Sequence, residues 1–166
     1  HFNHLKRDES ILDKHLVESF CKEKNIPFYY FELHLDNDDF QNKARIKRKE
    51  HLLSVANSNH IKNIITAHHL DDLAETILMK ISRGSSLLGY SGMMPSYVIS
   101  DITYLKPLLY TPKKDILSYA KENNIPYLED RTNKEDHYFR NRIRHHVIPI
   151  LSNNGSFDEQ IIRYHK

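Results

Sequence analysis

Apolar residues recur every three to four positions in three stretches of the first half of the chain, which is the spacing of one buried face of an α-helix. These stretches cover residues 8–25, 40–56 and 70–84. Two segments between them are typical of strands: the aromatic IPFYYFELHL at residues 26–35 and the β-branched IKNIITA at residues 61–67. Helices and strands that alternate at these lengths predict an α/β fold with a mostly parallel sheet flanked by helices.

The second half of the chain predicts fewer regular elements. The run SSLLGYSGMMPSYVIS, residues 85–100, mixes glycine with small and apolar side chains, which indicates an ordered loop. TYLKPLLY, residues 103–110, indicates a short strand, and Thr111 followed by Pro112 predicts a helix that the Thr111 hydroxyl caps. A later helix is expected to end near Pro149, because proline interrupts helical hydrogen bonding.

The composition excludes several classes of protein. A length of 166 residues suits one ordinary domain, and 39% hydrophobic against 28% charged residues is a globular balance. The single Cys21 excludes a disulfide framework, a CxxC zinc or redox site and a thiolate-bound iron–sulfur cluster within the chain. No apolar run approaches the roughly 20 residues of a membrane helix, and HFNHLKRDES is unlike a signal peptide. We therefore expect a cytoplasmic protein with no membrane partner, and with a net charge of only +2 any basic site has to be local.

The segment TAHHLDDLAET carries the candidate chemistry, since it lies where a predicted buried strand passes into a helix. Ligands gather at the carboxyl ends of strands in open α/β sheets. His68, Asp71 or Asp72, and Glu75 are spaced so that an imidazole and two carboxylates share one stripe of the helix. Such a stripe can hold a divalent cation, accept protons or capture an ammonium group, but it is also typical of a solvated helix N-terminus. Zinc is a minor alternative, because no HExxH motif or cysteine ligand set is present.

A longer run, TAHHLDDLAETILMKISRGSSLLGYSGM, resembles the signature of the tRNA(Ile)-lysidine synthetases, a family of the PP-loop ATP pyrophosphatase superfamily. The family pattern is roughly AHHxDDxxETxLxxxxRGxxxxGLxGM, and Tyr90 replaces its usual Leu. HFNH at residues 1–4 resembles the HxNH block of the family. Ala44, Arg45, Arg48 and Leu52 resemble its ARxxRYxxL helix, with Lys49 in the Tyr position. YLKPLL, IPYLEDRTN and FRNRIRHHVIPIL resemble three further blocks, so the resemblance runs from His1 to Leu151 in family order.

The resemblance implies a Rossmann-like PP-loop ATPase domain of the adenine nucleotide α hydrolase type over residues 1–151, with 152–166 as the start of a C-terminal extension or linker. The family's phosphate-binding SGGxDS loop is expected before HFNH, so we expect the chain to be a fragment. The implied reaction adenylates the C2 oxygen of the wobble cytidine in a CAU anticodon with ATP, and lysine then displaces AMP. The implied partners are ATP, Mg²⁺, L-lysine and tRNA(Ile), and a homodimer stays open.

The resemblance also implies roles for individual residues. Asp72 and Glu75 match the acidic pair expected to bind lysine and handle its proton, with Asp71 as a third substrate-binding, structural or metal-linked carboxylate. Arg48 and Arg140 join them as expected catalytic residues that stabilise phosphate charge. The residues expected near the nucleotide are His1, Asn3, His4, Thr66, His68, Arg83 and Gly84, and Gly84 is equally typical of a plain helix C-cap. The residues expected to contact the tRNA backbone are Arg131, Lys134, Arg142 and Arg144.

Three alternatives remain at this point. Another PP-loop enzyme such as a tRNA thiolase is disfavoured, because those enzymes use cysteines and the chain has only Cys21. A non-catalytic tRNA-binding domain would bind tRNA without converting it. A carboxylate-bridged metal hydrolase built on His68, Asp71, Asp72 and Glu75 would release its product without lysine.

Overall fold

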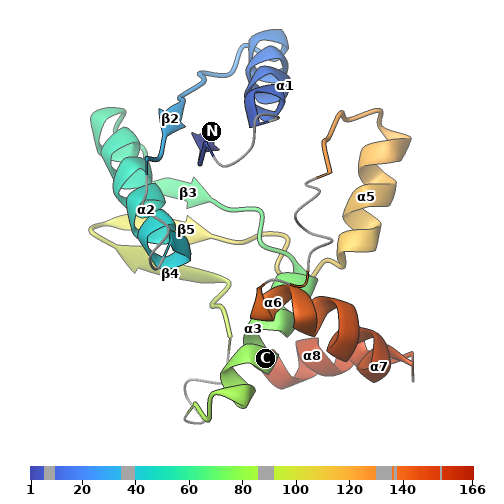
Figure 1. The fold of residues 1–166 in the computed structure, drawn as a ribbon. Helices are drawn as coiled ribbons and strands as arrows, with labels where there is room; N and C mark the ends of the chain where they lie inside the picture. The colour runs from blue at the N-terminus through green and yellow to red at the C-terminus, as the bar shows by residue number, and fades with distance from the viewer. Residues whose placement is uncertain (6–9, 35–39, 86–91, 130–135, 137, 154) are drawn as a thin grey trace. The chain divides into compact units, whose positions relative to one another are not determined.

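The structure is a computed structural model; the residues it describes are 1–5, 10–34, 40–85, 92–129, 136, 138–153 and 155–166 (Figure 1). These residues belong to two compact units. One comprises His1–Lys62 and Pro126–Leu128, and the other comprises Asn63–Ile125 and Glu129–Lys166. Each unit contains a parallel strand pair with helices, which confirms the predicted α/β class with a mostly parallel sheet.

The first unit is built on two short strands and two helices. Its elements are β1 (Phe2–Asn3), α1 (Ser10–Glu23), β2 (Phe31–Glu32) and α2 (Phe40–Ser58). The strands pair in parallel with Phe2 opposite Phe31. The ring of Phe31 stacks on Phe2 (5.5 Å between centroids) and on His51 of α2 (4.3 Å), so aromatic contacts attach α2 to the strands. The strand predicted over residues 26–35 is shorter than expected because β1 offers only two residues for pairing.

The second unit holds a three-stranded sheet and most of the helices. Its elements are β3 (Asn63–Ile65), α3 (Leu70–Ser82), β4 (Ser96–Ile99), β5 (Ile102–Leu105), α5 (Lys113–Glu122), α6 (Phe139–Arg142), the π-helix η2 (Ile143–Val147), α7 (Ile148–Ser152) and α8 (Phe157–His165). The strand order is β3-β5-β4, with β3 and β5 parallel and β4 antiparallel to β5. Among the described helices, none combines the length and apolar character needed to cross a membrane.

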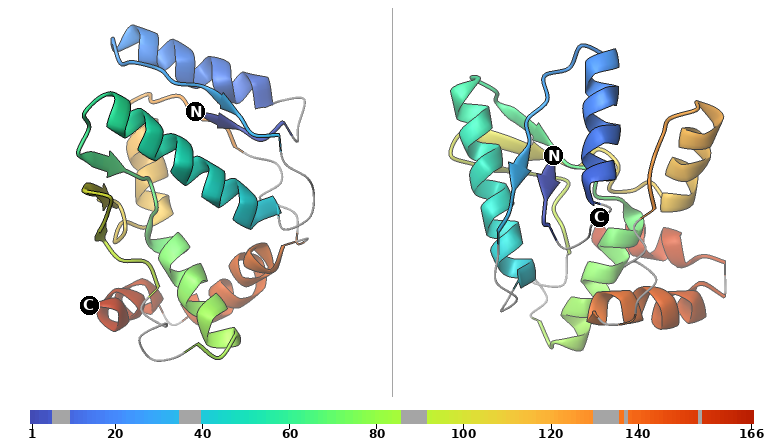
Figure 2. Two further views of the ribbon diagram at one scale, coloured as in Figure 1. Left: turned by 90° about the vertical axis from the view of Figure 1, so that its left-hand side faces the viewer. Right: turned by 45° about the horizontal axis from the view of Figure 1, so that its top comes forward.

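The core of the second unit forms around α3, whose apolar residues recur at helical spacing. Leu70, Leu73, Ala74 and Ile77 are buried there with Leu109 and Ile161. Ile161 belongs to α8, so the segment expected to begin an extension packs against α3 (Figure 2). Gly92 adopts φ +75°, and a Cβ atom there would lie 2.7 Å from the Leu73 side chain. Glycine at this position therefore lets the backbone approach α3 closely.

One strand was missed by the sequence analysis. β4 lies within residues 85–100, which were predicted to be a loop. It pairs with β5 through a two-residue turn in which Ser100 and Asp101 both have positive φ, 48° and 62°. Two-residue hairpin turns with positive φ at both positions usually have the sequence Asn-Gly or Asp-Gly, and Ser-Asp is not typical of them.

Two predicted helix boundaries were also wrong. Thr111 does not cap α5, whose N-cap residue is Pro112; the backbone N–H of Lys113 instead bonds to the Asp71 side chain. The helix expected to end near Pro149 continues through it to Ser152. A wide π turn precedes this proline, with Ile148 N bonding to Ile143 O, and Pro149 lies in the first turn of α7, where the missing N–H costs little.

Candidate active site

The chain passes from β3 into α3 through TAHHL, as the sequence predicts. The backbone N–H of Thr66 bonds to Leu105 O of β5 (2.9 Å), and the Thr66 hydroxyl lies 2.9 Å from Nδ1 of His68. Both residues are half-buried. The polar segment therefore begins at the carboxyl end of a sheet strand, the usual position of ligand sites in α/β folds.

The two adjacent aspartates at the start of α3 each hold a helix N-terminus. Asp72 accepts a hydrogen bond from the backbone N–H of His69 at 3.1 Å, which closes the first turn of α3. Asp71 accepts from the backbone N–H of Lys113 at 3.0 Å, at the start of α5. Carboxylates are favoured at helix N-termini, so part of the acidic character of this segment is structural.

Glu75 lies at the centre of an ion-pair cluster that links α3 to the helix containing Arg140. Its carboxylate is fully buried, with 0% of the side chain exposed. Oε2 lies 2.5 Å from Arg140 Nε, and Oε1 lies 2.5 Å from Arg144 Nε. Arg140 also reaches Asp72, with Nη2 3.1 Å from Oδ1. We call Asp72, Glu75, Arg140 and Arg144 the carboxylate–arginine cluster.

The cluster is formally neutral, because two carboxylates face two guanidinium groups. Burial alone lowers the pKa of Arg144, but the hydrogen bond from Arg144 to Glu75 and the charges of Glu75, Asp72 and Asp71 outweigh it, so the pKa lies above its ordinary value. A buried carboxylate without such partners would be strongly destabilising. The arginines are therefore part of what lets Glu75 be buried.

The structure brings three of the predicted catalytic residues together and adds a fourth residue. Asp72, Glu75 and Arg140 meet, and their catalytic roles stay predictions. Arg144, which was assigned to tRNA, is bound to Glu75. Its only signal in the sequence is its spacing four residues after Arg140, which places both arginines on one helical face. The direct contact predicted between Glu75 and lysine stays a prediction, and in this structure both Glu75 oxygens are held by arginines.

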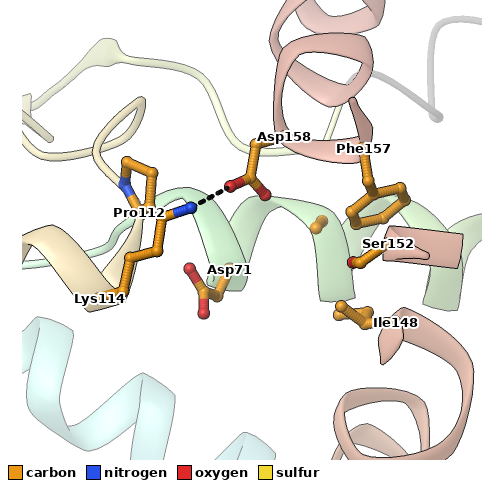
Figure 3. A pocket seen from close by; sticks show the side chains of 8 residues that line it. Asp71, Pro112, Lys114, Ile148, Ser152, Phe157 and Asp158 are labelled. Atoms are coloured by element: carbon orange, nitrogen blue, oxygen red, sulfur yellow. Dashed lines mark ion pairs between the residues drawn. The ribbon is translucent and has the colours of Figure 1, made fainter. Parts of the chain in front are cut away.

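A small cavity of about 160 Å³ lies on the Asp71 side of α3. Figure 3 shows its polar side, where Lys114 and Asp158 form an ion pair of 3.7 Å near Asp71, and its apolar side at Ile148 and Phe157. The side chains of the three α3 carboxylates differ in exposure: 42% for Asp71, 18% for Asp72 and 0% for Glu75. Asp71 is therefore the most accessible to a ligand.

Comparison with known proteins shows the family and the fold of the chain. A family model described as the PP-loop domain matches residues 1–151. The chain belongs to the PP-loop domain family. A solved U34-tRNA thiolase, NcsA from Methanococcus maripaludis with its 4Fe–4S cluster, matches with a TM-score of 0.76 over 98% of this chain and 58% of that one. At 17% identity, this likeness shows the Rossmann-like fold alone.

Curated relatives of this PP-loop chain are longer proteins. A tRNA(Ile)-lysidine synthase of Aster yellows witches'-broom phytoplasma is 49% identical over 99% of this chain and 38% of its own length. A bifunctional protein TilS/HprT of Listeria innocua is 35% identical over 92% of this chain and 24% of its own length. The chain thus spans well under half the length of these relatives.

The other predicted site residues of the PP-loop chain are distributed over both units. His1, Asn3, His4 and Arg48 lie in the first unit, where Asn3 is buried and Arg48 is exposed on α2. Their contact with nucleotide or phosphate stays a prediction, as does that of Thr66 and His68. Arg131 and Lys134 lie outside the described residues.

Two predicted residues end α3. Arg83 is exposed, and Gly84 has φ +67° with its N–H bonded to Ile81 O, while Ser85 N bonds to Lys80 O. This is a Schellman motif, in which Arg83 is the C-cap and Gly84 is the left-handed residue that ends the helix. The contact of Arg83 and Gly84 with nucleotide stays a prediction. Arg142 is exposed and its guanidinium lies over the Phe139 ring, 5.5 Å from the centroid.

Proposed function

We propose that this chain is part of a tRNA(Ile)-lysidine synthase. The observation that carries the proposal is the meeting of Asp72 and Glu75, on the helix that follows β3, with Arg140, 65 residues after Glu75. Relatives that carry this name support it, with up to 49% identity across 99% of the chain. The reaction uses ATP as cosubstrate and joins L-lysine to the wobble cytidine of a CAU anticodon, and we place it in the cytoplasm.

The reaction needs both signs of charge at one place. In the first step, the cytidine C2 oxygen attacks the α-phosphate of ATP and pyrophosphate leaves. In the second, the lysine ε-amine attacks C2, the bond to the adenylate oxygen breaks, AMP leaves and the amine loses a proton. A cation is required beside the phosphate, and carboxylates are required beside the ammonium group.

We assign most of these groups to the carboxylate–arginine cluster and to Asp71, the residue before Asp72. Arg140 is our candidate for the phosphate charge of the adenylate, because its side chain is 37% exposed while Glu75 and Asp72 fix its orientation. Asp71 and Asp72 are our candidates for the lysine ammonium group, because they retain exposed carboxylate surface. Arg48 is proposed as a second phosphate-facing cation and Arg142 as a tRNA backbone contact.

Magnesium is a further expectation of the family resemblance. Among the described residues, no group of three or more His, Cys, Asp or Glu side chains is arranged to hold a metal ion. We therefore assign none of them to Mg²⁺ and derive no step through it.

The test is lysine incorporation by the intact protein that contains this chain. It is incubated with radiolabelled lysine, ATP and a tRNA(Ile) transcript that carries the CAU anticodon, with a UAU transcript as the matched control. We expect ATP-dependent incorporation into the CAU transcript only, with AMP and pyrophosphate released. Binding of the CAU transcript without incorporation would contradict the proposal and favour a non-catalytic tRNA-binding domain. Release of a tRNA product without lysine would favour a hydrolase.

A further inference from the structure

Arg144 has the same anchor as Arg140, but it contacts the opposite oxygen of the Glu75 carboxylate. Each arginine uses its Nε at 2.5 Å, one on Oε1 and the other on Oε2. Both oxygens of the Glu75 carboxylate thus accept hydrogen bonds, and the carboxylate cannot rotate without breaking one of them. The orientation of Arg140 therefore depends on Arg144, which holds the other oxygen of the Glu75 carboxylate.

The charge balance of the cluster gives a second reason why Arg140 depends on Arg144. Asp72 and Glu75 carry two negative charges, and Arg140 alone supplies one positive charge. With 0% of Glu75 exposed, water cannot supply the missing compensation. Arg144 does so, and the raised pKa of its guanidinium is consistent with that pairing. Without Arg144, Oε1 of the buried Glu75 carboxylate would lose its hydrogen-bond donor, and the carboxylate that orients Arg140 would be free to rotate.

The backbone at Arg144 is also specialised. The π-helix Ile143–Val147 begins one residue before Arg144, and Ile143 is buried, so the start of the wide turn is anchored in the core. π turns are rare and often occur at functional sites. The segment thus places Arg144 against α3 rather than leaving it on a solvated helical face.

We propose that Arg144 is a positioning residue of the active site, which fixes Glu75 and through it the guanidinium of Arg140. The inference rests on the proposed function and gives Glu75 a role that requires no contact with lysine. It also removes Arg144 from the group of residues expected to bind the tRNA backbone.

The experiment compares Arg144→Gln with Arg163→Gln in the intact protein. Arg163 is exposed on α8, so its replacement removes the same charge and side chain away from the cluster. We expect Arg144→Gln to lower kcat for lysidine formation at least tenfold, with the tRNA Kd and its salt dependence within twofold of wild type. Arg163→Gln should leave all three values within twofold. A wild-type kcat in folded Arg144→Gln, or a loss confined to tRNA affinity, would overturn the inference.

A double substitution tests whether Arg144 acts through Glu75. If it does, adding Arg144→Gln to Glu75→Gln should lower kcat no further than Glu75→Gln alone, because the carboxylate that transmits the effect is already gone. Independent, multiplicative losses would overturn the inference.

Arg144→Lys covers the case in which Arg144→Gln fails to fold. Lysine keeps the positive charge but cannot make the planar Nε contact. We therefore expect a folded protein that is active, with a kcat below that of wild type. Folded Arg144→Lys with wild-type kcat would make Arg144 a structural cation only. Absence of lysidine in the wild-type protein would instead refute the proposed function.

Discussion

Replacing Glu75 by glutamine tests the energetic importance of the carboxylate–arginine cluster. Glutamine has the same size and keeps one carbonyl oxygen as acceptor, but it lacks the charge and offers an N–H group where the second oxygen was. One of the two arginines therefore loses its acceptor at position 75, and Arg140 alone keeps a second carboxylate, Asp72. A hydrogen bond to a charged group contributes about 1.5–3 kcal/mol, and breaking a buried ion pair costs about 3–5 kcal/mol.

The exposure of the two arginines places the expected loss of stability near the boundary between these two ranges. The side chains of Arg140 and Arg144 are 37% and 28% exposed, so water partly compensates for the lost partner. We expect Glu75→Gln to lower the free energy of unfolding by about 2–3 kcal/mol. Urea denaturation of the intact protein, followed by circular dichroism, measures this change, with the m value expected to stay constant.

The matched control is Glu122→Gln, at the exposed end of α5. It removes the same charge where no buried partner depends on it, so the change should stay within about 0.5 kcal/mol. If Glu75→Gln also stays within about 0.5 kcal/mol of wild type, the cluster does not stabilise the fold as argued.

Three further predictions concern tRNA affinity, packing and pH. Arg142→Ala should weaken tRNA binding and reduce the salt slope of log K by about one, measured by filter binding at several salt concentrations, and an unchanged slope would contradict a phosphate contact. Gly92→Ala should lower the free energy of unfolding by about 1–3 kcal/mol in urea denaturation, because its Cβ would clash with α3 at positive φ; an unchanged midpoint would contradict the close approach. Hydrogen bonds from His146 and His145 hold the pKa of Asp136 below its ordinary value, so its stabilisation is complete above about pH 5 and is lost as the pH falls through the lower folded-state pKa. Asp136→Asn should therefore reduce the acid dependence of Tm below that pH, and an unaltered Tm profile would count against the pairing.

The sequence predicts the long helices well, because strong helical periodicity is a local signal. It also places the acidic segment where a strand passes into a helix, as the structure shows. α3 and its acidic residues are examples. The partner of Arg144 could not be predicted in the same way, because the contact joins residues 69 positions apart. The spacing of Arg140 and Arg144 shows that they share one helical face, but it does not show which residues that face contacts.

The missed boundaries have a similar physical origin. Thr111 and Pro112 form a good helix-start signal, yet the start of α5 is held by Asp71 from another helix. Pro149 is a good helix-stop signal, yet a preceding π turn makes room for it. In both cases tertiary structure or an unusual helix overrides a local preference.

The most direct test of the account is the nucleoside composition of tRNA(Ile) after incubation with the intact protein, ATP and lysine, measured by mass spectrometry for wild type and Asp72→Asn. The account predicts lysidine in the wild-type digest and almost none with Asp72→Asn, while tRNA binding by the two proteins stays equal. Undiminished lysidine with Asp72→Asn would contradict the assignment of the reaction to this cluster.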